Sequence, residues 1–180
     1  GIPKTEAIRQ LGLDPLKRYV CFIGSATASL GFGVLLEAMA GVRSRMPSAT
    51  LLHAGHLDPS FALPDSALSI GHCGQDKVAL ALSASDCGVV PYQQSLQVKY
   101  SNSCKLAEYI AIGLPVVATV SGDNERVLGK EYIGLVPPGD PGRLARAIAA
   151  QLENPVPTTG RERFTWDFLG RKLEGFLRDL

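Results

Sequence analysis

The chain has 180 residues, of which 46% are hydrophobic and 19% are charged. This is enough chain for one domain with its own core, and the composition is too apolar for a disordered tail. The 18 Lys and Arg residues against 17 Asp and Glu leave a formal net charge of +1, and no basic block stands out. A protein that holds nucleic acid or an anionic membrane through bulk charge is therefore excluded.

The four cysteines stand singly, at positions 21, 73, 87 and 104. Without a CxxC pair they predict free thiols in a reducing cytosol and neither a zinc ribbon nor a disulfide framework. No apolar run approaches the ~18–20 residues that a bilayer span needs, and the first residues lack the apolar core of a signal peptide. The expected protein is cytoplasmic and has no transmembrane segment.

Short apolar runs alternate with helical patterns along the chain. A helix is expected over residues 5–11, and the run 19–23, closed by Gly24, predicts a strand buried on both faces. The further expected strands are 50–54, 68–70, 87–90, 116–119 and 133–136, and the further expected helices are 34–46, 78–85, 104–112 and a segment with Leu144, Ile148 and Leu152 on one face. Repeated strand–helix units with short links predict an α/β fold, a parallel sheet with helices on both faces.

The last part of the chain reads differently. Residues 154–160 are rich in proline and threonine and predict a linker, and apolar residues then recur at helical spacing from Phe164 to Leu180. Periodicity shows a stripe that is buried without showing what buries it, so this helix packs either on its own sheet or on another domain. The expected division is 1–153, led by a segment and helix over 1–18, and 154–180.

Ligands bind an open parallel sheet beyond the carboxyl ends of its strands. The loop 25–31, which follows Gly24, is small and polar enough to let a ligand approach main-chain N–H groups at a helix N-terminus. It is neither a Walker loop nor a GxGxxG fingerprint, and an ordinary tight turn is the alternative.

The loop 91–103 is one of the longest irregular stretches between two expected elements, and it ends in Ser101, Asn102 and Ser103. One of these side chains can cap the helix that follows, which leaves hydroxyl and N–H groups to hold an anion such as phosphate. Lys105 and Glu108 are three residues apart and share a face of that helix. The alternative for this pair is a surface ion pair of little energy.

Histidine and cysteine residues do not predict a metal site. His53, His56, His72 and Cys73 match no zinc spacing, and His53 falls inside an expected strand. His56 and His72 are better explained as loop residues near a pocket. No nucleophile elbow and no Ser/His/Asp order is present.

Residues 105–119, together with several other blocks, carry a family resemblance. They resemble the donor-site motif of retaining glycosyltransferases of the GT-B architecture, group 1 or family 4-like, which include bacterial mannosyl- and glucosyltransferases and sucrose synthases. The supporting blocks occur in the family's order and are 34–38, 54–55, 85–87 with 90–92, 122–125, 134–140 and the aromatic motif 164–166.

The resemblance implies one half of an enzyme: residues 1–153 as the C-terminal, Rossmann-like domain that binds a nucleotide-sugar donor, and 154–180 as a helix that packs toward a missing N-terminal domain that binds the acceptor. It implies a hexose transferred from a nucleoside diphosphate sugar to a saccharide or lipid-linked acceptor, in polysaccharide or glycoconjugate synthesis, with no metal or other cofactor and no nucleic-acid partner. In the full-length protein, peripheral binding at the inner membrane face is also compatible with it. The isolated domain is expected to be inactive.

Site residues follow from the resemblance position by position. Glu108 matches a glutamate that accepts hydrogen bonds from the donor ribose, and residues 101–105 match the loop and helix start that hold the diphosphate. Gly74 fits the loop near the base, with Cys73 and Gln75 as neighbours. The resulting donor-binding residues are Gly24, Ser25, Gly74, Ser101, Asn102, Ser103, Cys104, Lys105 and Glu108.

Three positions depart from the family's pattern. Ser25 and Leu30 stand where the family has an arginine and a lysine that pair with the diphosphate, and Tyr100 stands where a first glutamate contacts the transferred sugar. Tyr100 and Lys105 are the candidates for groups near the sugar and the diphosphate, while the catalytic residues themselves stay unassigned. Lys105, with Lys99 as the other nearby cation, is expected to carry part of the missing charge from the start of the helix.

Two other classes of function stay open. A degenerate domain that keeps the fold as an interaction module would explain Ser25 and Leu30, whereas Glu108 and its hydroxyl-rich loop favour the transferase. An epimerase of similar architecture fits the aromatic tail and the 134–140 block less well.

Overall fold

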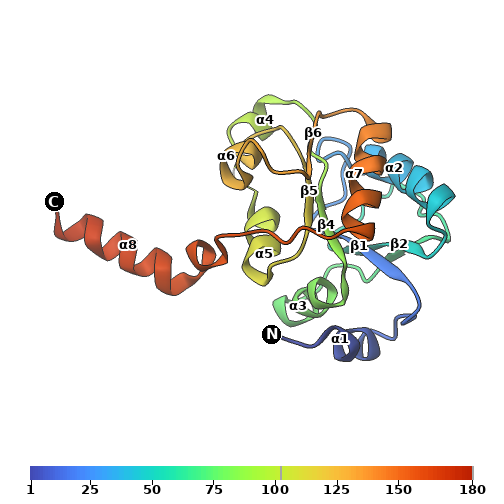
Figure 1. The fold of residues 1–180 in the computed structure, drawn as a ribbon, viewed down its shortest axis with the longest axis horizontal. Coiled ribbons are helices and arrows are strands. Elements are labelled where there is room, and N and C mark those ends of the chain that lie inside the picture. Colours follow the sequence, from blue (N-terminus) through green and yellow to red (C-terminus); the bar gives the residue numbers. More distant parts are fainter. Residues whose placement is uncertain (102, 180) are drawn as a thin grey trace.

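The computed structural model describes residues 1–101 and 103–179. A sheet of six strands in the order β3-β2-β1-β4-β5-β6 forms the centre of the molecule, and all of its pairings are parallel (Figure 1). The strands are β1 (Arg18–Ile23), β2 (Ala49–Ala54), β3 (Ala67–Ser69), β4 (Cys87–Val90), β5 (Val116–Thr119) and β6 (Leu135–Val136).

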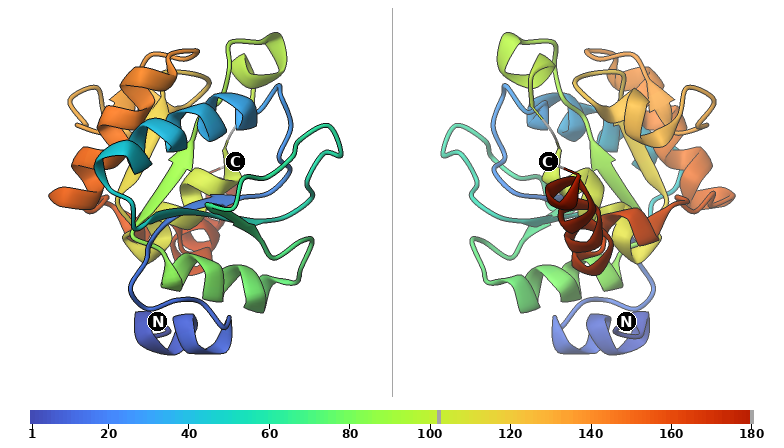
Figure 2. Two further views of the ribbon diagram at one scale, coloured as in Figure 1. Left: turned by 90° about the vertical axis from the view of Figure 1, so that its right-hand side faces the viewer. Right: turned by 90° about the vertical axis from the view of Figure 1, so that its left-hand side faces the viewer.

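Helices cover both faces of this sheet (Figure 2). The helices are α1 (Lys4–Gln10), α2 (Phe32–Arg45), α3 (Gln75–Ala84), α4 (Leu96–Lys99), α5 (Cys104–Ile112), α6 (Asn124–Leu128), α7 (Pro141–Glu153) and α8 (Trp166–Arg178), with a 3-10 turn η1 (Arg161–Phe164). The predicted α/β fold, a Rossmann-like parallel sheet with helices on both faces, is confirmed.

Alternating side chains of β1 divide the core into two layers. Tyr19, Cys21 and Ile23 pack with α3 and α5, and α1 lies outside against α3. Val20 and Phe22 point to the other face, where they pack with α2 and α7. Because β1, β2, β4 and β5 are buried on both faces, they read in the sequence as unbroken apolar runs, and each of these strand predictions is confirmed.

The structure contains two short helices that the sequence pattern did not predict. Helix α4 lies inside the expected loop 91–103, where the Ser95 hydroxyl accepts a hydrogen bond from the Val98 amide at 3.1 Å. Helix α6 follows β5. Elements of four and five residues are too short to show a helical period. The strand expected over 133–136 is shorter, because only Leu135 and Val136 pair with β5.

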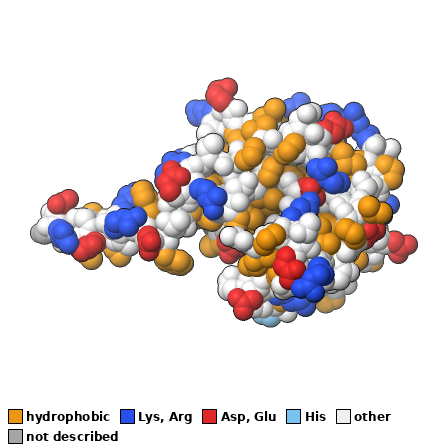
Figure 3. Space-filling model, turned by 60° about the horizontal axis from the view of Figure 1, so that its bottom comes forward, with side chains coloured by type: hydrophobic (Ala, Val, Ile, Leu, Met, Phe, Trp, Pro, Cys, Tyr) orange, Lys and Arg blue, Asp and Glu red, His pale blue; other side chains and the backbone are white. Residues whose placement is uncertain are grey.

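Helix α8 extends away from the sheet domain (Figures 1 and 3). The Thr165 hydroxyl caps it by accepting a hydrogen bond from the Phe168 amide at 3.3 Å, and none of its residues is buried. Trp166, Leu173 and Phe176 are exposed by 88%, 59% and 62%. The sheet domain therefore does not bury the predicted apolar stripe. None of the helices in the described ranges is both long enough and apolar enough to span a membrane.

Candidate functional site

A cavity of about 360 Å³ lies at the carboxyl ends of β1 and β2, and we call it the β1 cavity. Its walls come from the two strand ends, the loop and first turns of α3, the residue Tyr92 after β4, and the start of α5. The lining residues are Ile23, Gly24, Ala54, Gly55, His72, Cys73, Gln75, Val78, Tyr92, Cys104, Lys105 and Glu108. This is the edge of a parallel sheet at which ligands bind.

The floor of the β1 cavity is formed by two glycines in close contact. A Cβ atom on Gly55 would lie 2.2 Å from the Gly24 carbonyl oxygen, so no side chain fits there. The buried ring of His53 fixes the same carbonyl, because its Nε2 lies 2.9 Å from the Gly24 oxygen and its Nδ1 lies 2.9 Å from the Ser69 hydroxyl. A carbonyl only accepts, so Nε2 donates and Nδ1 accepts. Burial lowers the pKa of His53, which suits this neutral, structural role.

Lys105 is buried at the base of the β1 cavity. Its side chain is 8% exposed, and its ammonium lies 4.0 Å from the centroid of the Phe22 ring and 5.1 Å from that of Tyr92. Among the described residues the Lys105 Nζ has no hydrogen-bond partner. Burial lowers the pKa of Lys105 to about 8, an effect that the nearby Glu108 carboxylate opposes. The aromatic faces attract the cation but give it no hydrogen bond.

This position argues against the alternative of a surface ion pair. The Lys105 side chain is buried, and no ion pair with Glu108 is present among the described residues. The side chain passes over Gly24, where an added Cβ atom would make only ordinary van der Waals contact with the Lys105 Cε and Nζ, at 3.6 and 3.7 Å. The aliphatic stem thus crosses the end of β1 and brings the charge to the ring of Phe22, on the opposite face of the sheet.

Glu108 lines the β1 cavity one turn further along α5. Its side chain is half-buried, and this burial raises the pKa of its carboxyl group while the Lys105 charge acts against the shift. A carboxylate that is partly removed from water and accessible from a cavity is suited to accept hydrogen bonds from ligand hydroxyls.

Helix α5 is held firmly against the sheet. The Ser103 hydroxyl accepts a hydrogen bond from the Leu106 amide at 3.2 Å and caps the helix, which confirms the expected capping by one of the three polar residues. One turn later the buried Tyr109 hydroxyl accepts from the Ile23 amide and donates to the Cys21 carbonyl, both at 3.2 Å. Gly88 is required opposite this ring, since a Cβ atom there would lie 2.6 Å from it.

Of the expected donor-binding residues, the β1 cavity brings together Gly24, Cys104, Lys105 and Glu108. The other described ones do not line it. Ser25 is exposed, Gly74 is the N-cap of α3 between lining residues, and the Ser103 hydroxyl is engaged as a cap. The Ser101 hydroxyl donates to the Val98 carbonyl, Tyr100 is 79% exposed outside the cavity, and Asn102 lies outside the described residues.

Gly55 and Tyr92 are among the lining residues that had no assigned role in the sequence. Both lie just beyond strand ends, Gly55 directly after β2 and Tyr92 two residues after the end of β4. Their position just after a strand could have predicted this, because the carboxyl ends of adjacent parallel strands meet at one edge of the sheet.

Within residues 1–101 and 103–179, no three His, Cys, Asp or Glu side chains are grouped so that they could hold a metal ion. His53, the most buried of the histidines considered, is instead engaged on both ring nitrogens. The four cysteines are free, with Cys21 and Cys87 buried, Cys73 half-buried and Cys104 exposed.

A parallel sheet of this order, with a cavity at its carboxyl edge and a capped helix N-terminus beside it, defines a Rossmann-like domain of the kind that binds nucleotides. Residues 17–154 match the sequence profile of the family described as glycosyl transferases group 1. The chain therefore belongs to the group 1 glycosyltransferases. Direct comparison with curated proteins finds no match.

Solved structures support the same fold. Sucrose-phosphate synthase from Thermosynechococcus elongatus is 25% identical and superposes with a TM-score of 0.72 over 98% of this chain and 49% of its own. HepE of Anabaena, solved with UDP and glucose, is 18% identical with a TM-score of 0.68, over 84% of this chain and 42% of its own.

A third structure is the C-terminal domain of the group 1 glycosyl transferase LpcC from Francisella tularensis. It is 15% identical and matches with a TM-score of 0.67 over 86% of this chain and 89% of its own. The chain thus spans about half the length of the synthase and of HepE, and it has the fold of one Rossmann-like unit of a GT-B glycosyltransferase.

Proposed function

We propose that this chain is the C-terminal, donor-binding half of a retaining glycosyltransferase. It would bind a nucleoside diphosphate sugar in the β1 cavity, for transfer of a hexose to a saccharide or lipid-linked acceptor in polysaccharide or glycoconjugate synthesis. The observation that carries the proposal is that one cavity holds both the half-buried Glu108 carboxylate and the buried Lys105 ammonium, which has no hydrogen-bond partner among the described residues.

In the proposal, Glu108 binds the ribose of the donor, and Lys105 and the N-terminus of α5 bind its diphosphate. The Glu108 carboxylate accepts hydrogen bonds from the ribose hydroxyls, since an ionised carboxylate only accepts. The N-terminus of α5, at Cys104 and Lys105, lies on the same wall of the cavity and favours negative charge, so it stabilises the diphosphate as the leaving group. The transfer then needs no metal and no other cofactor, and the loop at Gly74 would lie near the base.

Lys105 replaces part of the charge that the family usually supplies from the β1–α2 loop. Ser25 and Leu30 cannot pair with a diphosphate, and two charge-assisted contacts of ~1.5–3 kcal/mol each are lost with them. A buried ammonium without a hydrogen-bond partner in the described structure gains one when an anionic ligand enters. In the proposal the N-terminal N–H groups of α5, with Ser101 and Ser103 before it, would complete this anion site, and Tyr100, which lies outside the β1 cavity, would reach the transferred sugar from beyond its rim.

The proposed whole protein has a second domain that binds the acceptor. The exposed apolar stripe of α8 supports this arrangement, because a helix of this pattern needs a partner surface. Residues 154–180 would pack toward that domain, at a cytoplasmic location or peripherally at the inner membrane face. The 180-residue chain by itself would bind donor weakly and transfer nothing.

Calorimetric titration with UDP, GDP and ADP tests the proposal. We expect saturable binding of one nucleotide, and a loss of at least tenfold in affinity in both Glu108→Gln and Lys105→Met. Glu153→Gln, an exposed glutamate at the end of α7, is the matched control and should bind like the unchanged protein. Full affinity in Lys105→Met would show that this lysine does not carry the diphosphate.

The alternative is a degenerate domain that has kept the fold without the ligand. Ser25 and Leu30, which remove two cations from the loop after β1, are the observation in its favour. No binding of any of the three nucleotides at millimolar concentration, with the protein folded, would favour this alternative.

A further inference from the structure

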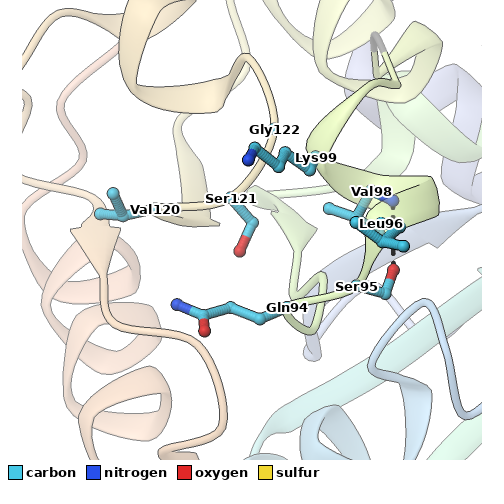
Figure 4. Close-up of a pocket in the computed structure, with 8 residues that line it drawn as sticks. All are labelled: Gln94, Ser95, Leu96, Val98, Lys99, Val120, Ser121 and Gly122. Carbon is cyan, nitrogen blue, oxygen red and sulfur yellow. Dashed lines mark hydrogen bonds between the residues drawn. The ribbon is translucent and has the colours of Figure 1, made fainter.

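A second cavity, of about 420 Å³, lies at the same carboxyl edge of the sheet, and we call it the β5 cavity. It is bounded by the segment 94–99, which follows β4, and by residues 120–122, which follow β5 (Figure 4). Its volume falls in the range of small-molecule sites, roughly 300–1,000 Å³. Nothing in the proposed donor site occupies it.

Polar groups from both segments face this space. In Figure 4 the Gln94 amide, the Ser121 hydroxyl and the Lys99 side chain extend toward the gap between the two loops. The Ser121 hydroxyl donates to the Tyr92 carbonyl at 3.4 Å, which leaves its oxygen able to accept from a ligand. The Lys99 ammonium lies 5.5 Å from the centroid of the exposed Tyr100 ring.

The walls between these groups are apolar. Leu96 and Val120, exposed by 76% and 40%, border the same space. Among the described residues that line the β5 cavity none is acidic. A site with an amide, a hydroxyl and apolar surface matches a sugar ring, because the ring hydroxyls need hydrogen bonds and the CH groups need apolar contact. The one cation, Lys99, matches a negative group on that ring.

The β5 cavity is preformed. A Cβ atom on Gly122 would lie 2.6 Å from the Val98 carbonyl oxygen, so the two loops are in direct contact at that glycine. The Thr119 hydroxyl also donates to the Tyr92 carbonyl at 2.8 Å and ties the end of β5 to the segment after β4. Binding in such a cavity costs little ordering of the loops.

The two cavities are neighbours along the chain. Tyr92 lines the β1 cavity and Gln94, two residues later, lines the β5 cavity. A group bound in the second cavity would thus be held next to the donor, as a transfer between two substrates requires.

We propose that the β5 cavity binds the acceptor, a saccharide whose ring carries a carboxylate. The Gln94 amide and the Ser121 hydroxyl bind ring hydroxyls, and the Lys99 ammonium pairs with the carboxylate. This inference rests on the proposed function, because it assigns the acceptor of the same transfer, and it places part of that acceptor on this chain.

The test compares methyl β-glucuronide with methyl β-glucoside, which differ only at C6, where the first has a carboxylate and the second a hydroxymethyl group. Binding to the isotope-labelled chain is followed through the backbone amide signals of Val120, Ser121 and Gly122. We expect saturable shifts with the glucuronide bound at least fivefold more tightly. Lys99→Met should abolish that preference, and Gln94→Ala should weaken both ligands at least threefold. Lys172→Met, at an exposed lysine of α8, is the control and should change nothing.

Absence of saturable shifts up to about 50 mM of either sugar would overturn the proposal, as would an unchanged preference in Lys99→Met. UDP, GDP and ADP binding is measured on the same variants. Because neither Gln94 nor Lys99 lines the β1 cavity, nucleotide binding retained without sugar binding would reject the acceptor site alone. If the unchanged protein binds none of the three nucleotides, the proposed function is rejected instead.

Discussion

At the scale of single residues, Lys105 is the most unusual feature of the molecule. Its ammonium is removed from water and is left without a hydrogen-bond partner in the described structure. Buried cations are costly unless they are paired, and groups kept in this state are common at binding sites. The ring faces of Phe22 and Tyr92 reduce the cost, but the free protein still holds a charge that an anionic ligand would stabilise.

This cost predicts that Lys105→Met stabilises the free protein near neutral pH. The pKa of Lys105 is lowered from 10.5 to about 8, so burying its charged form costs roughly 3 kcal/mol of folding free energy. Below pH 8 the lysine is charged in both the folded and the unfolded chain, so the Met variant has its full advantage. Between about pH 8 and 10.5 only the unfolded chain keeps the proton, so the stability of the unchanged protein rises with pH and the advantage shrinks.

Urea denaturation of both proteins at pH 7 and pH 9.5 measures this difference. We expect the larger gain for the variant at pH 7, together with weaker nucleotide binding, a trade of stability for function. An equal gain at both pH values would mean that the charge of Lys105 is not the source of the effect.

At the scale of elements, helix α5 joins the β1 cavity to the centre of the sheet. Its residues 104, 105 and 108 line the β1 cavity, and Tyr109 on its inner face is hydrogen-bonded to β1. The position of Glu108 and Lys105 therefore depends on how well this helix is fixed.

We expect Tyr109→Phe to destabilise the protein by about 1–3 kcal/mol, because the buried Ile23 amide loses its acceptor. Tyr100→Phe is the matched control: Tyr100 is 79% exposed, and the same loss of a hydroxyl should change the free energy of unfolding by no more than ~0.5 kcal/mol. Chemical denaturation distinguishes the two variants. Equal effects would show that the hydrogen bonds of Tyr109 do not anchor α5.

Some elements of the fold could be predicted from the sequence and others could not. Strands such as β4 and β5 were predictable to the residue, because they are buried on both faces and a proline stands directly beside each, Pro91 after β4 and Pro115 before β5. Helix α4 was not, since four residues cannot show a period and its cap at Ser95 lies in a polar loop.

The candidate site was predictable in part. The resemblance and the helical spacing placed Glu108 and Lys105 on one helix, beside a loop at the carboxyl edge of the sheet. The inward turn of Lys105 was not predictable, because it depends on contact with a ring of Phe22 from the opposite face of the sheet. The role of Gly55 likewise depends on its contact with Gly24, 31 positions away in the sequence.

At the scale of the whole molecule, the sheet domain packs as one unit and α8 lies outside it. The linker is tied to the domain, as the Tyr132 hydroxyl donates to the Val156 carbonyl and the Thr158 hydroxyl donates to the Leu114 carbonyl. Phe164 still packs against the core, whereas no residue of α8 is buried.

Truncation after Thr165 should therefore change the free energy of unfolding by no more than ~0.5 kcal/mol. Truncation after Asn154 should destabilise clearly, because it removes both linker hydrogen bonds and Phe164. Urea unfolding of the three chain lengths provides the measurement. A large drop in the free energy of unfolding after truncation at Thr165 would mean that α8 packs on the sheet domain in solution.

The central claim is that the β1 cavity holds a nucleoside diphosphate between Glu108 and Lys105. A crystal structure of the chain with UDP, GDP or ADP, whichever binds most tightly, tests this most directly. We predict a ribose hydroxyl within ~3.2 Å of the Glu108 carboxylate and the diphosphate at the N-terminus of α5, with the Lys105 ammonium in hydrogen-bond contact. A nucleotide bound outside the β1 cavity, or inside it with the ribose away from Glu108, would contradict the account.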